Sequence, residues 1–354
     1  MRCNECKEVF IFLLLLICCL EVVELAIDER LKDDFFHIYK NAAIETRDIQ
    51  NKPVTEDKVT FYLYTHENPK EFTAIDKDDL ERFRNTTNQI VFLIHGWTNS
   101  RENEWMEDLK NAFLIRDKDC FVVIVDWKEP ANQFYYVSSI NTYDVSRFIA
   151  NLLVNLWKNY GVDKSNFLLV GHSLGGQICG FVGKHFKKQT LQTLPRIVAL
   201  DPAGPLFTTR PISKRLNKDD ADVVEVVHTD GGTFGFQDAL GTIDFFVNGG
   251  SSQPGCKQID LANLFGSIEE PLMCDHRRAW AYFTEAVLNP TDLVAQKCAS
   301  WGQYKINYCD KETVPMGDLN TTLTGSFYLD TNKEKPYSKK SDSSLLSFSR
   351  LLIG

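Results

Sequence analysis

The stretch FLLVGHSLGGQICGFVGK, residues 167–184, decides the fold. Its first four residues are an apolar run typical of a buried strand, and its last eight form a small-residue helical pattern. Between them stands G-x-S-x-G, with Gly171, Ser173 and Gly175 at its fixed positions. A strand, a sharp turn and a helix in this order predict that the turn exposes the serine oxygen. Ser173 is therefore the candidate nucleophile.

The glycines of this turn are required for steric reasons. A strained backbone pushes the oxygen of Ser173 into the open, and side chains at Gly171 and Gly175 would collide with the adjoining strand and helix. The helix that follows directs free N–H groups and the positive end of its dipole toward the serine. An oxyanion formed during acyl transfer would be stabilised at this point.

Further apolar runs, rich in β-branched and aromatic residues, predict strands on both sides of the motif. They lie at residues 59–64, 90–94, 121–125, 167–170, 197–200 and 223–227. A helical pattern covers residues 145–157, and Asn141 or Thr142 is expected to cap its start. Alternating strands and helices predict a mostly parallel sheet covered by helices on both faces, here an α/β-hydrolase fold.

A serine nucleophile needs a histidine base and an acid that orients it. In this fold the acid and the histidine follow the serine in the chain. Asp201 comes directly after the strand at 197–200, so it is the candidate acid, unless it only caps the turn before Pro202. His276, expected in a loop before a helical pattern, is favoured as the base over His228, which is expected to pack at a strand end.

The oxyanion hole should use two backbone N–H groups. Leu174, the residue after the nucleophile, supplies one, and Trp97, after the strand at 90–94, supplies the other. The alternative is that His95 and Trp97 only pack the strand end. Asp275, beside His276, is expected to face solvent.

Composition and charge limit the function classes. The chain has 354 residues and a net charge of −9, which argues against nucleic-acid binding because that depends on clustered Lys and Arg. A basic start and a short apolar run at residues 9–20 predict a secretory signal peptide over residues 1–26. The alternative is a membrane-anchored N-terminus. We expect the hydrolase domain at residues 27–335 and a poorly ordered tail at 336–354.

Cysteines and glycosylation motifs agree with secretion. Behind the predicted signal peptide remain Cys120, Cys179, Cys256, Cys274, Cys298 and Cys309. An even count in an exported chain indicates disulfides, although the sequence alone allows fifteen pairings. Asn85 and Asn320 each start an Asn-Thr-Thr glycosylation triplet.

The chain resembles the animal pancreatic-lipase family, within its insect phospholipase A1 and neutral-lipase branch. The matching motifs span residues 58–330: FYLYTHENP, VFLIHGW, VIVDWK, VGHSLGG, ALDPAGP, VVHTDGG, IDFFVNGGSSQPGC, CDHRRA, CAS and FYLDT. The resemblance implies the triad Ser173, Asp201 and His276, with Trp97 and Leu174 as the oxyanion hole. It also implies disulfides Cys256–Cys274 and Cys298–Cys309, which leaves Cys120 and Cys179 either bridged or as buried thiols.

The resemblance further implies a lipid substrate at a membrane, micelle or droplet surface, reached through a lid at residues 256–274. The lid's apolar residues would dock on that surface, unless the lid packs permanently on the body; they are Ile259, Leu261, Leu264, Phe265, Ile268 and Leu272. The seventeen residues between the lid cysteines make a shorter lid than that of pancreatic lipases. The surface loop at 229–243 is also brief, as is typical of phospholipase A1 members.

Other family features are expected to be absent. We expect neither the C-terminal β-sandwich domain of the larger lipases nor colipase binding, and no catalytic cofactor. Some relatives hold a structural calcium ion. The corresponding positions are Ile212, Arg215, Asn217 and Asp220, where Asn217 replaces an aspartate and so removes one charged oxygen ligand.

Three functions are therefore compared. Phospholipase A1, cutting the sn-1 ester of glycerophospholipids, is favoured. A neutral lipase acting on tri- or diacylglycerol is the alternative, because the lid is longer than in wasp venom enzymes. A lipid-binding protein like the insect yolk proteins, which have lost triad residues, is disfavoured because all three triad residues are present.

Overall fold

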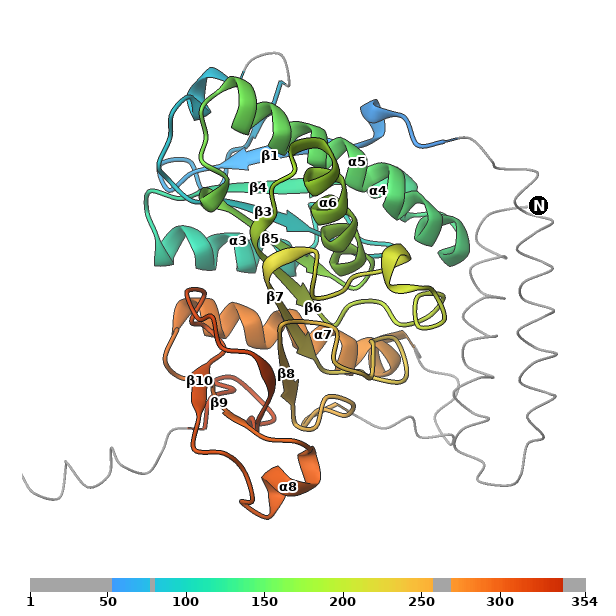
Figure 1. Ribbon diagram of the computed structural model, residues 1–354, viewed down its shortest axis with the longest axis vertical. Helices are drawn as coiled ribbons and strands as arrows, with labels where there is room; N and C mark the ends of the chain where they lie inside the picture. Colours follow the sequence, from blue (N-terminus) through green and yellow to red (C-terminus); the bar gives the residue numbers. More distant parts are fainter. Residues whose placement is uncertain (1–52, 77–79, 257–268, 340–354) are drawn as a thin grey trace, which may run out of the picture.

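The apolar runs of the sequence become neighbouring strands of one sheet (Figure 1). The computed structural model describes residues 53–76, 80–256 and 269–339. Within them, eleven strands lie in the following order. From edge to edge these are β10 (Thr313–Pro315), β9 (Val294–Lys297), β11 (Gly325–Leu329), β8 (Ile243–Val247), β7 (Ala221–His228), β6 (Leu194–Leu200), β5 (Phe167–His172), β3 (Ile90–Ile94), β4 (Phe121–Asp126), β1 (Thr60–Tyr64) and β2 (Thr73–Ala74).

The seven strands from β11 to β4 run parallel, and β9, β10, β1 and β2 pair antiparallel at the two edges. All residues of β3 and β5 are buried, as expected for strands covered on both faces. The register of β5 and β6 pairs His172 with Leu200. Ser173 and Asp201, the next residues of the two strands, therefore leave the sheet side by side at its carboxyl edge.

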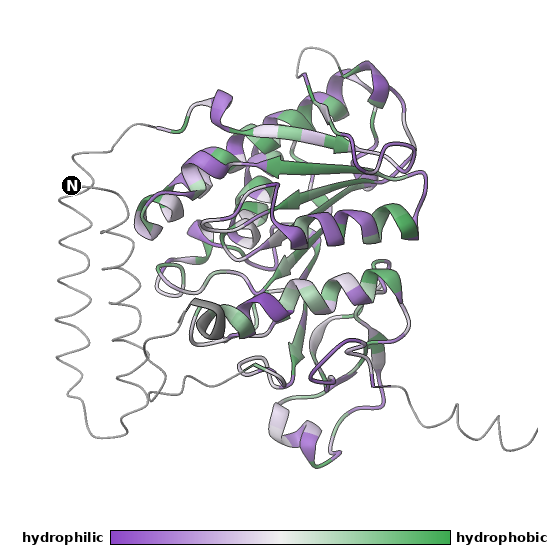
Figure 2. Cartoon of the chain, turned by 180° about the vertical axis from the view of Figure 1, so that it is seen from behind, coloured by the Kyte–Doolittle hydropathy of each residue, from purple (hydrophilic) through white to green (hydrophobic). Residues whose placement is uncertain are grey.

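Helices cover both faces of the sheet. They are α3 (Glu104–Arg116), α4 (Lys128–Ala131), α5 (Tyr135–Asn159), α6 (Leu174–Thr190), α7 (Glu269–Leu288) and α8 (Trp301–Lys305), with 3-10 turns η1 (Glu56–Lys58), η2 (Glu81–Phe83), η3 (Lys164–Asn166) and η4 (Ile212–Lys214). One core cluster joins α5 and α6 to the sheet, and a second joins α3 and α7 to its other face. Figure 2, from behind, shows α3 and α7 in front of the sheet. The predicted α/β-hydrolase fold class is confirmed.

The predicted helix cap at Asn141 or Thr142 is wrong. Helix α5 begins at Tyr135, ten residues before the apolar pattern at 145–157 that indicated it. Its first turns carry buried Ser138, Ser139 and Thr142, and Ser139 and Thr142 donate to carbonyls three residues back, at 2.7 Å each. These small polar residues satisfy their hydroxyls on the helix itself, so the helix continues through a stretch that is not apolar.

Several predictions concern residues outside the described ranges. These are the signal peptide at 1–26, the tail from residue 340 onward, and the lid residues Ile259, Leu261, Leu264, Phe265 and Ile268. The lid residue Leu272 lies in α7, but its side chain is not among those described. In the described part of the chain, no helix combines the length and apolarity needed to cross a bilayer.

Candidate active site

Ser173 lies between β5 and α6, at the carboxyl edge of the parallel strands. Its backbone has φ 57° and ψ −121°, a conformation that L-residues rarely adopt. Two backbone hydrogen bonds hold it: the Ser173 N–H donates to the Leu200 carbonyl at 3.0 Å, and the Ala203 N–H donates to the Ser173 carbonyl at 3.1 Å. The expected strained turn is therefore present, and the end of β6 supports it.

The glycines around Ser173 stand where no side chain fits. A Cβ on Gly171 would lie 2.2 Å from the Gly175 carbonyl oxygen, and one on Gly175 would lie 2.2 Å from the carbonyl oxygen of Ile94. A Cβ on Gly96 would lie 2.9 Å from the Ser173 Cβ. The ends of β3 and β5 and the start of α6 thus approach one another around Ser173 as closely as atoms allow, because glycine stands at each contact.

Gly175→Ala should destabilise the fold by about 2–3 kcal/mol, because the added methyl meets backbone rather than a side chain that can turn away. Urea unfolding followed by circular dichroism measures this. The matched control is Gly302→Ala in α8, where the nearest atom to the new Cβ is the Ser300 Oγ at 3.9 Å. The control should change stability by less than about 1 kcal/mol. Equal effects of the two substitutions would contradict the packing described for the turn.

Asp201 and His276 form a buried pair beside the serine. The Nδ1–H of His276 donates to Asp201 Oδ2 at 2.6 Å, and the two side chains are 1% and 0% exposed. The other oxygen, Oδ1, accepts from the backbone N–H groups of Thr229 at 2.9 Å and Asp230 at 3.1 Å. With Nδ1 carrying its proton, the imidazole presents Nε2 as its basic nitrogen.

His172 connects this pair to the nucleophile. It precedes Ser173 in the chain, and its ring centroid lies 4.5 Å from that of His276. Its Nε2–H donates to the His276 carbonyl at 3.0 Å, and burial lowers its pKa well below the usual value. A neutral His172 therefore holds the backbone of His276 next to Ser173. Sequence reasoning missed this role, because nothing in the motif distinguishes His172 from a packing residue.

The expectation that His276 lies in a loop is wrong. It lies inside α7, which begins at Glu269. The charged run CDHRR indicated a loop because apolar periodicity starts only after it. Asp275 does not face solvent freely either: it is half-buried, and its Oδ1 accepts from the Gln253 N–H at 2.6 Å.

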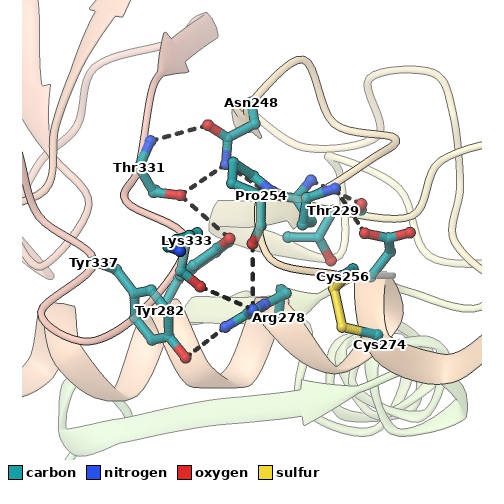
Figure 3. Close-up of a disulfide and its surroundings, with 12 residues drawn as sticks. Thr229, Asn248, Pro254, Cys256, Cys274, Arg278, Tyr282, Thr331, Lys333 and Tyr337 are labelled. Carbon is teal, nitrogen blue, oxygen red and sulfur yellow. Dashed lines mark hydrogen bonds between the residues drawn. A yellow bond between two sulfur atoms is a disulfide. The ribbon is translucent and has the colours of Figure 1, made fainter. Parts of the chain in front are cut away.

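A covalent and polar network fixes this end of α7 (Figure 3). The Cys256–Cys274 disulfide ties the loop after β8 to the helix, two residues before His276. One turn of the chain further, the Arg278 guanidinium donates to the Pro254 carbonyl at 3.2 Å, the Lys333 carbonyl at 3.1 Å and the Tyr337 hydroxyl at 2.6 Å. His276 is therefore held between a disulfide two residues before it and the bonds of Arg278 two residues after it.

A second buried carboxyl, unforeseen from the sequence, lies against the pair. Asp230 is 3% exposed, and its carboxyl, an Asp201 carboxylate oxygen and a His276 ring nitrogen lie within 4.8 Å of one another. Burial and the Asp201 and Asp275 carboxylates raise the pKa of Asp230 to about 9. Asp230 is therefore a neutral acid at pH 7.

The two expected oxyanion donors flank Ser173. Leu174 is the first residue of α6, where a backbone N–H has no acceptor within the helix. Trp97 follows Gly96, whose backbone approaches Ser173 closely. Its side chain turns away: the indole N–H donates to the Gln133 carbonyl at 2.8 Å and the ring packs on Tyr135. A backbone role for Trp97 is thus compatible with a packing role for its side chain.

The two other histidines near the sheet edge are packed residues. His95 is fully buried, lies 3.1 Å from Asp126 and stacks on Trp127. His228 is also fully buried, with Nε2 at 2.9 Å from Asp244 Oδ1 and Nδ1 at 2.9 Å from the Phe236 carbonyl. Neither ring contacts Asp201, and this distinguishes both histidines from His276.

A family model described as "Lipase" matches residues 33–337. The chain belongs to the lipase family. The resemblance to the pancreatic-lipase family and its phospholipase A1 members is thereby confirmed. Its relatives include Lipase member H-A of Xenopus laevis, 37% identical over 78% of this chain and 58% of the relative. Phospholipase A1 of Vespa velutina is 34% identical over 79% of this chain and 94% of the relative.

Pancreatic triacylglycerol lipase of Oryctolagus cuniculus is 34% identical over 70% of this chain and 56% of the relative. The chain thus spans 58% of the length of the Xenopus relative and a similar share of the rabbit enzyme, whereas it covers nearly all of the wasp protein. The family alone therefore leaves open which ester this member of the lipase family acts on.

In this lipase-family chain the cysteines pair as the resemblance implied. Disulfides join Cys256 to Cys274 and Cys298 to Cys309. Cys120 and Cys179 are separate buried thiols, and burial raises the pKa of Cys120 to about 12. Asn85 and Asn320, the expected glycosylation acceptors, are both exposed.

Proposed function

We propose that this chain is a secreted serine hydrolase that cleaves carboxylic esters of lipids and releases a fatty acid. The observation that carries the proposal is the buried Asp201–His276 pair, joined at 2.6 Å, beside a serine held at φ 57°. An imidazole oriented by a carboxylate, next to a serine on a strained turn, is the arrangement that activates a hydroxyl for acyl transfer.

The residues define the steps. His276 Nε2 takes the proton of Ser173 as its Oγ attacks the ester carbonyl, and Asp201 stabilises the resulting imidazolium. The oxyanion accepts hydrogen bonds from the Trp97 and Leu174 N–H groups. When the C–O bond breaks, His276 returns the proton to the departing alcohol. Water, deprotonated by His276, then attacks the acyl-serine, and the fatty acid leaves as Ser173 regains its proton.

Within this class we propose phospholipase A1 activity, at a membrane, micelle or droplet surface. The connection between β7 and β8, residues 229–242, supports it. The Gly204 N–H donates to the Phe234 carbonyl at 2.8 Å, and the Phe236 N–H donates to the Pro202 carbonyl at 3.0 Å. We infer that a connection held against the Asp201 turn leaves room beside Ser173 for a phospholipid head group. The similarity to the wasp phospholipase A1 points the same way.

The alternative is a neutral lipase for tri- or diacylglycerol, favoured by the similarity to the rabbit pancreatic enzyme. A non-catalytic lipid-binding protein is less favoured, because such relatives have lost triad residues and this chain keeps Ser173, Asp201 and His276. The two disulfides support the proposed secretion, since such bonds persist in oxidising compartments.

The substrate assay uses phosphatidylcholine with different acyl chains at its two positions, compared with a triacylglycerol emulsion. We expect the sn-1 fatty acid from phosphatidylcholine at a rate at least about ten times that from triacylglycerol, a difference of roughly 1.4 kcal/mol in transition-state binding. Ser173→Ala, assayed in parallel, subtracts background hydrolysis. Release from triacylglycerol alone would reject the phospholipase proposal and leave the ester-hydrolase proposal intact.

A further inference from the structure

The segment at which the family resemblance implied calcium lies directly on α6. Its four expected ligands are Ile212, Arg215, Asn217 and Asp220. Two glycines of the helix allow the segment to lie this close. A Cβ on Gly180 would lie 2.8 Å from the Leu216 Cα, and a Cβ on Gly183 would lie 2.1 Å from the Asp220 carbonyl oxygen. The segment therefore packs against the helix that follows Ser173.

A lysine of that helix reaches into the centre of the segment. The Lys184 ammonium donates to the Arg215 carbonyl at 2.8 Å and to both carboxylate oxygens of Asp220 at 2.5 Å each. Asp220 is 3% exposed, and the Lys184 side chain is 24% exposed. Lys184 thus bonds two of the four oxygen groups from which calcium coordination would be built.

The side chain of Asn217 directs its amide N–H₂ toward the Ile212 carbonyl and the Asp220 carboxylate. Its Nδ2 donates to the Ile212 carbonyl at 3.1 Å and to Asp220 Oδ1 at 3.2 Å. The orientation of the amide is set by its other end, because Oδ1 accepts from the Asp219 N–H at 2.9 Å. A nitrogen donor therefore faces inward where a calcium site needs an oxygen.

These residues do not fit a calcium ion. Calcium takes six to eight oxygen ligands at about 2.3–2.6 Å and favours sites rich in carboxylates. Here a single carboxylate, Asp220, is already paired with a cation, and bound calcium would lie against the Lys184 ammonium.

We propose that the Lys184 ammonium is a built-in cation that takes the place of a structural calcium ion, and that segment 211–220 is held on α6 without metal. Gln177 extends the same attachment toward the active site: its Oε1 accepts from the Leu216 N–H at 2.8 Å, and its Nε2 donates to the Ala203 carbonyl at 2.9 Å. Lys184 is a structural residue in this account, independent of the proposed ester hydrolysis.

Calcium binding by calorimetry, together with thermal unfolding at pH 7.5 with millimolar calcium or EGTA, tests this. The wild-type protein should bind no calcium at the segment, and its Tm should be the same in both buffers. Lys184→Ser should lower the Tm by several degrees. The exposed neighbour Lys187→Ser, on the same helix, should leave it unchanged.

The double variant Lys184→Ser/Asn217→Asp restores a second carboxylate and removes the ammonium group from the centre of the segment. We expect it to gain calcium binding and a Tm that rises by about 5 °C or more in calcium. Calcium binding by the wild-type protein that the Asp220→Asn substitution abolishes would overturn the proposal. So would a Lys184→Ser protein as stable as Lys187→Ser, a result that does not depend on whether the double variant folds.

Discussion

Ser173→Ala lowers kcat/KM for ester hydrolysis by about 10⁶-fold in this account, because removal of a catalytic serine costs as much as removal of the whole triad. The fold should be unaffected. Alanine, like serine, is an L-residue with a Cβ at φ 57°, so the substitution adds no backbone strain. Fatty-acid release measures the effect, with the melting temperature as the check on folding. Retention of more than about one per cent of wild-type activity would contradict the role of Ser173.

Asp201→Asn should lower kcat by about 10⁴-fold through the tautomer of His276. The Asp201 Oδ1 accepts two backbone N–H bonds, so an asparagine would keep its carbonyl oxygen there and turn its N–H₂ toward His276. A donor in place of the carboxylate would require Nδ1 of His276 to accept, which puts the ring proton on Nε2. The base then cannot take the serine proton.

Asp230→Asn is the matched control for this substitution. It removes a carboxyl that lies within 4.8 Å of the same groups but is neutral at pH 7, since its pKa is raised to about 9. An asparagine of nearly equal shape should leave kcat within about threefold of wild type. Equal losses in Asp201→Asn and Asp230→Asn would mean that general damage to the pocket, rather than the tautomer of His276, explains the effect. Steady-state kinetics at pH 7 separates the outcomes.

The central strands and the serine turn could be predicted because local chemistry determines them. Strands buried on both faces must be almost wholly apolar, so β3, β4 and β5 appear as unbroken runs. Gly171 is required by a contact within the same strand–turn–helix unit, and Gly175 by a contact with Ile94 at the end of the neighbouring strand β3. Asp201 followed because β6 ends one residue before it.

Other features depend on partners far apart in the chain. The apolar pattern of α5 begins only at Val145, and its polar first turns are stabilised by hydroxyl–carbonyl bonds that no periodicity indicates. The α7 residues around His276 are held by Arg278, which lies within the helix and reaches Pro254 and Lys333. The pairing of β11 with β8 and β9 likewise joins segments about 30 to 80 residues apart, so sequence patterns did not indicate this edge of the sheet.

The contacts of several charged residues could not be predicted for the same reason. Lys184 was read only as the end of the nucleophile helix, and its partner Asp220 lies 36 residues away. Asp230 lies in the motif VVHTDGG, but only the packing of the β7–β8 connection against Asp201 buries it. Charge pairs of this kind arise from the tertiary fold. The resemblance to the lipase family indicated where functional residues stand in the sequence, but it did not indicate which residues they contact.

The measurement that tests the central claim most directly is covalent labelling with a fluorophosphonate, followed by peptide mass spectrometry. Only a serine activated by a base reacts rapidly with such a probe. If Ser173 has the proposed catalytic role, we expect one adduct, on the peptide containing Ser173, absent in Ser173→Ala and slowed by several orders of magnitude in His276→Ala. A folded wild-type protein that takes up no probe, or takes it up at another serine, would contradict that role.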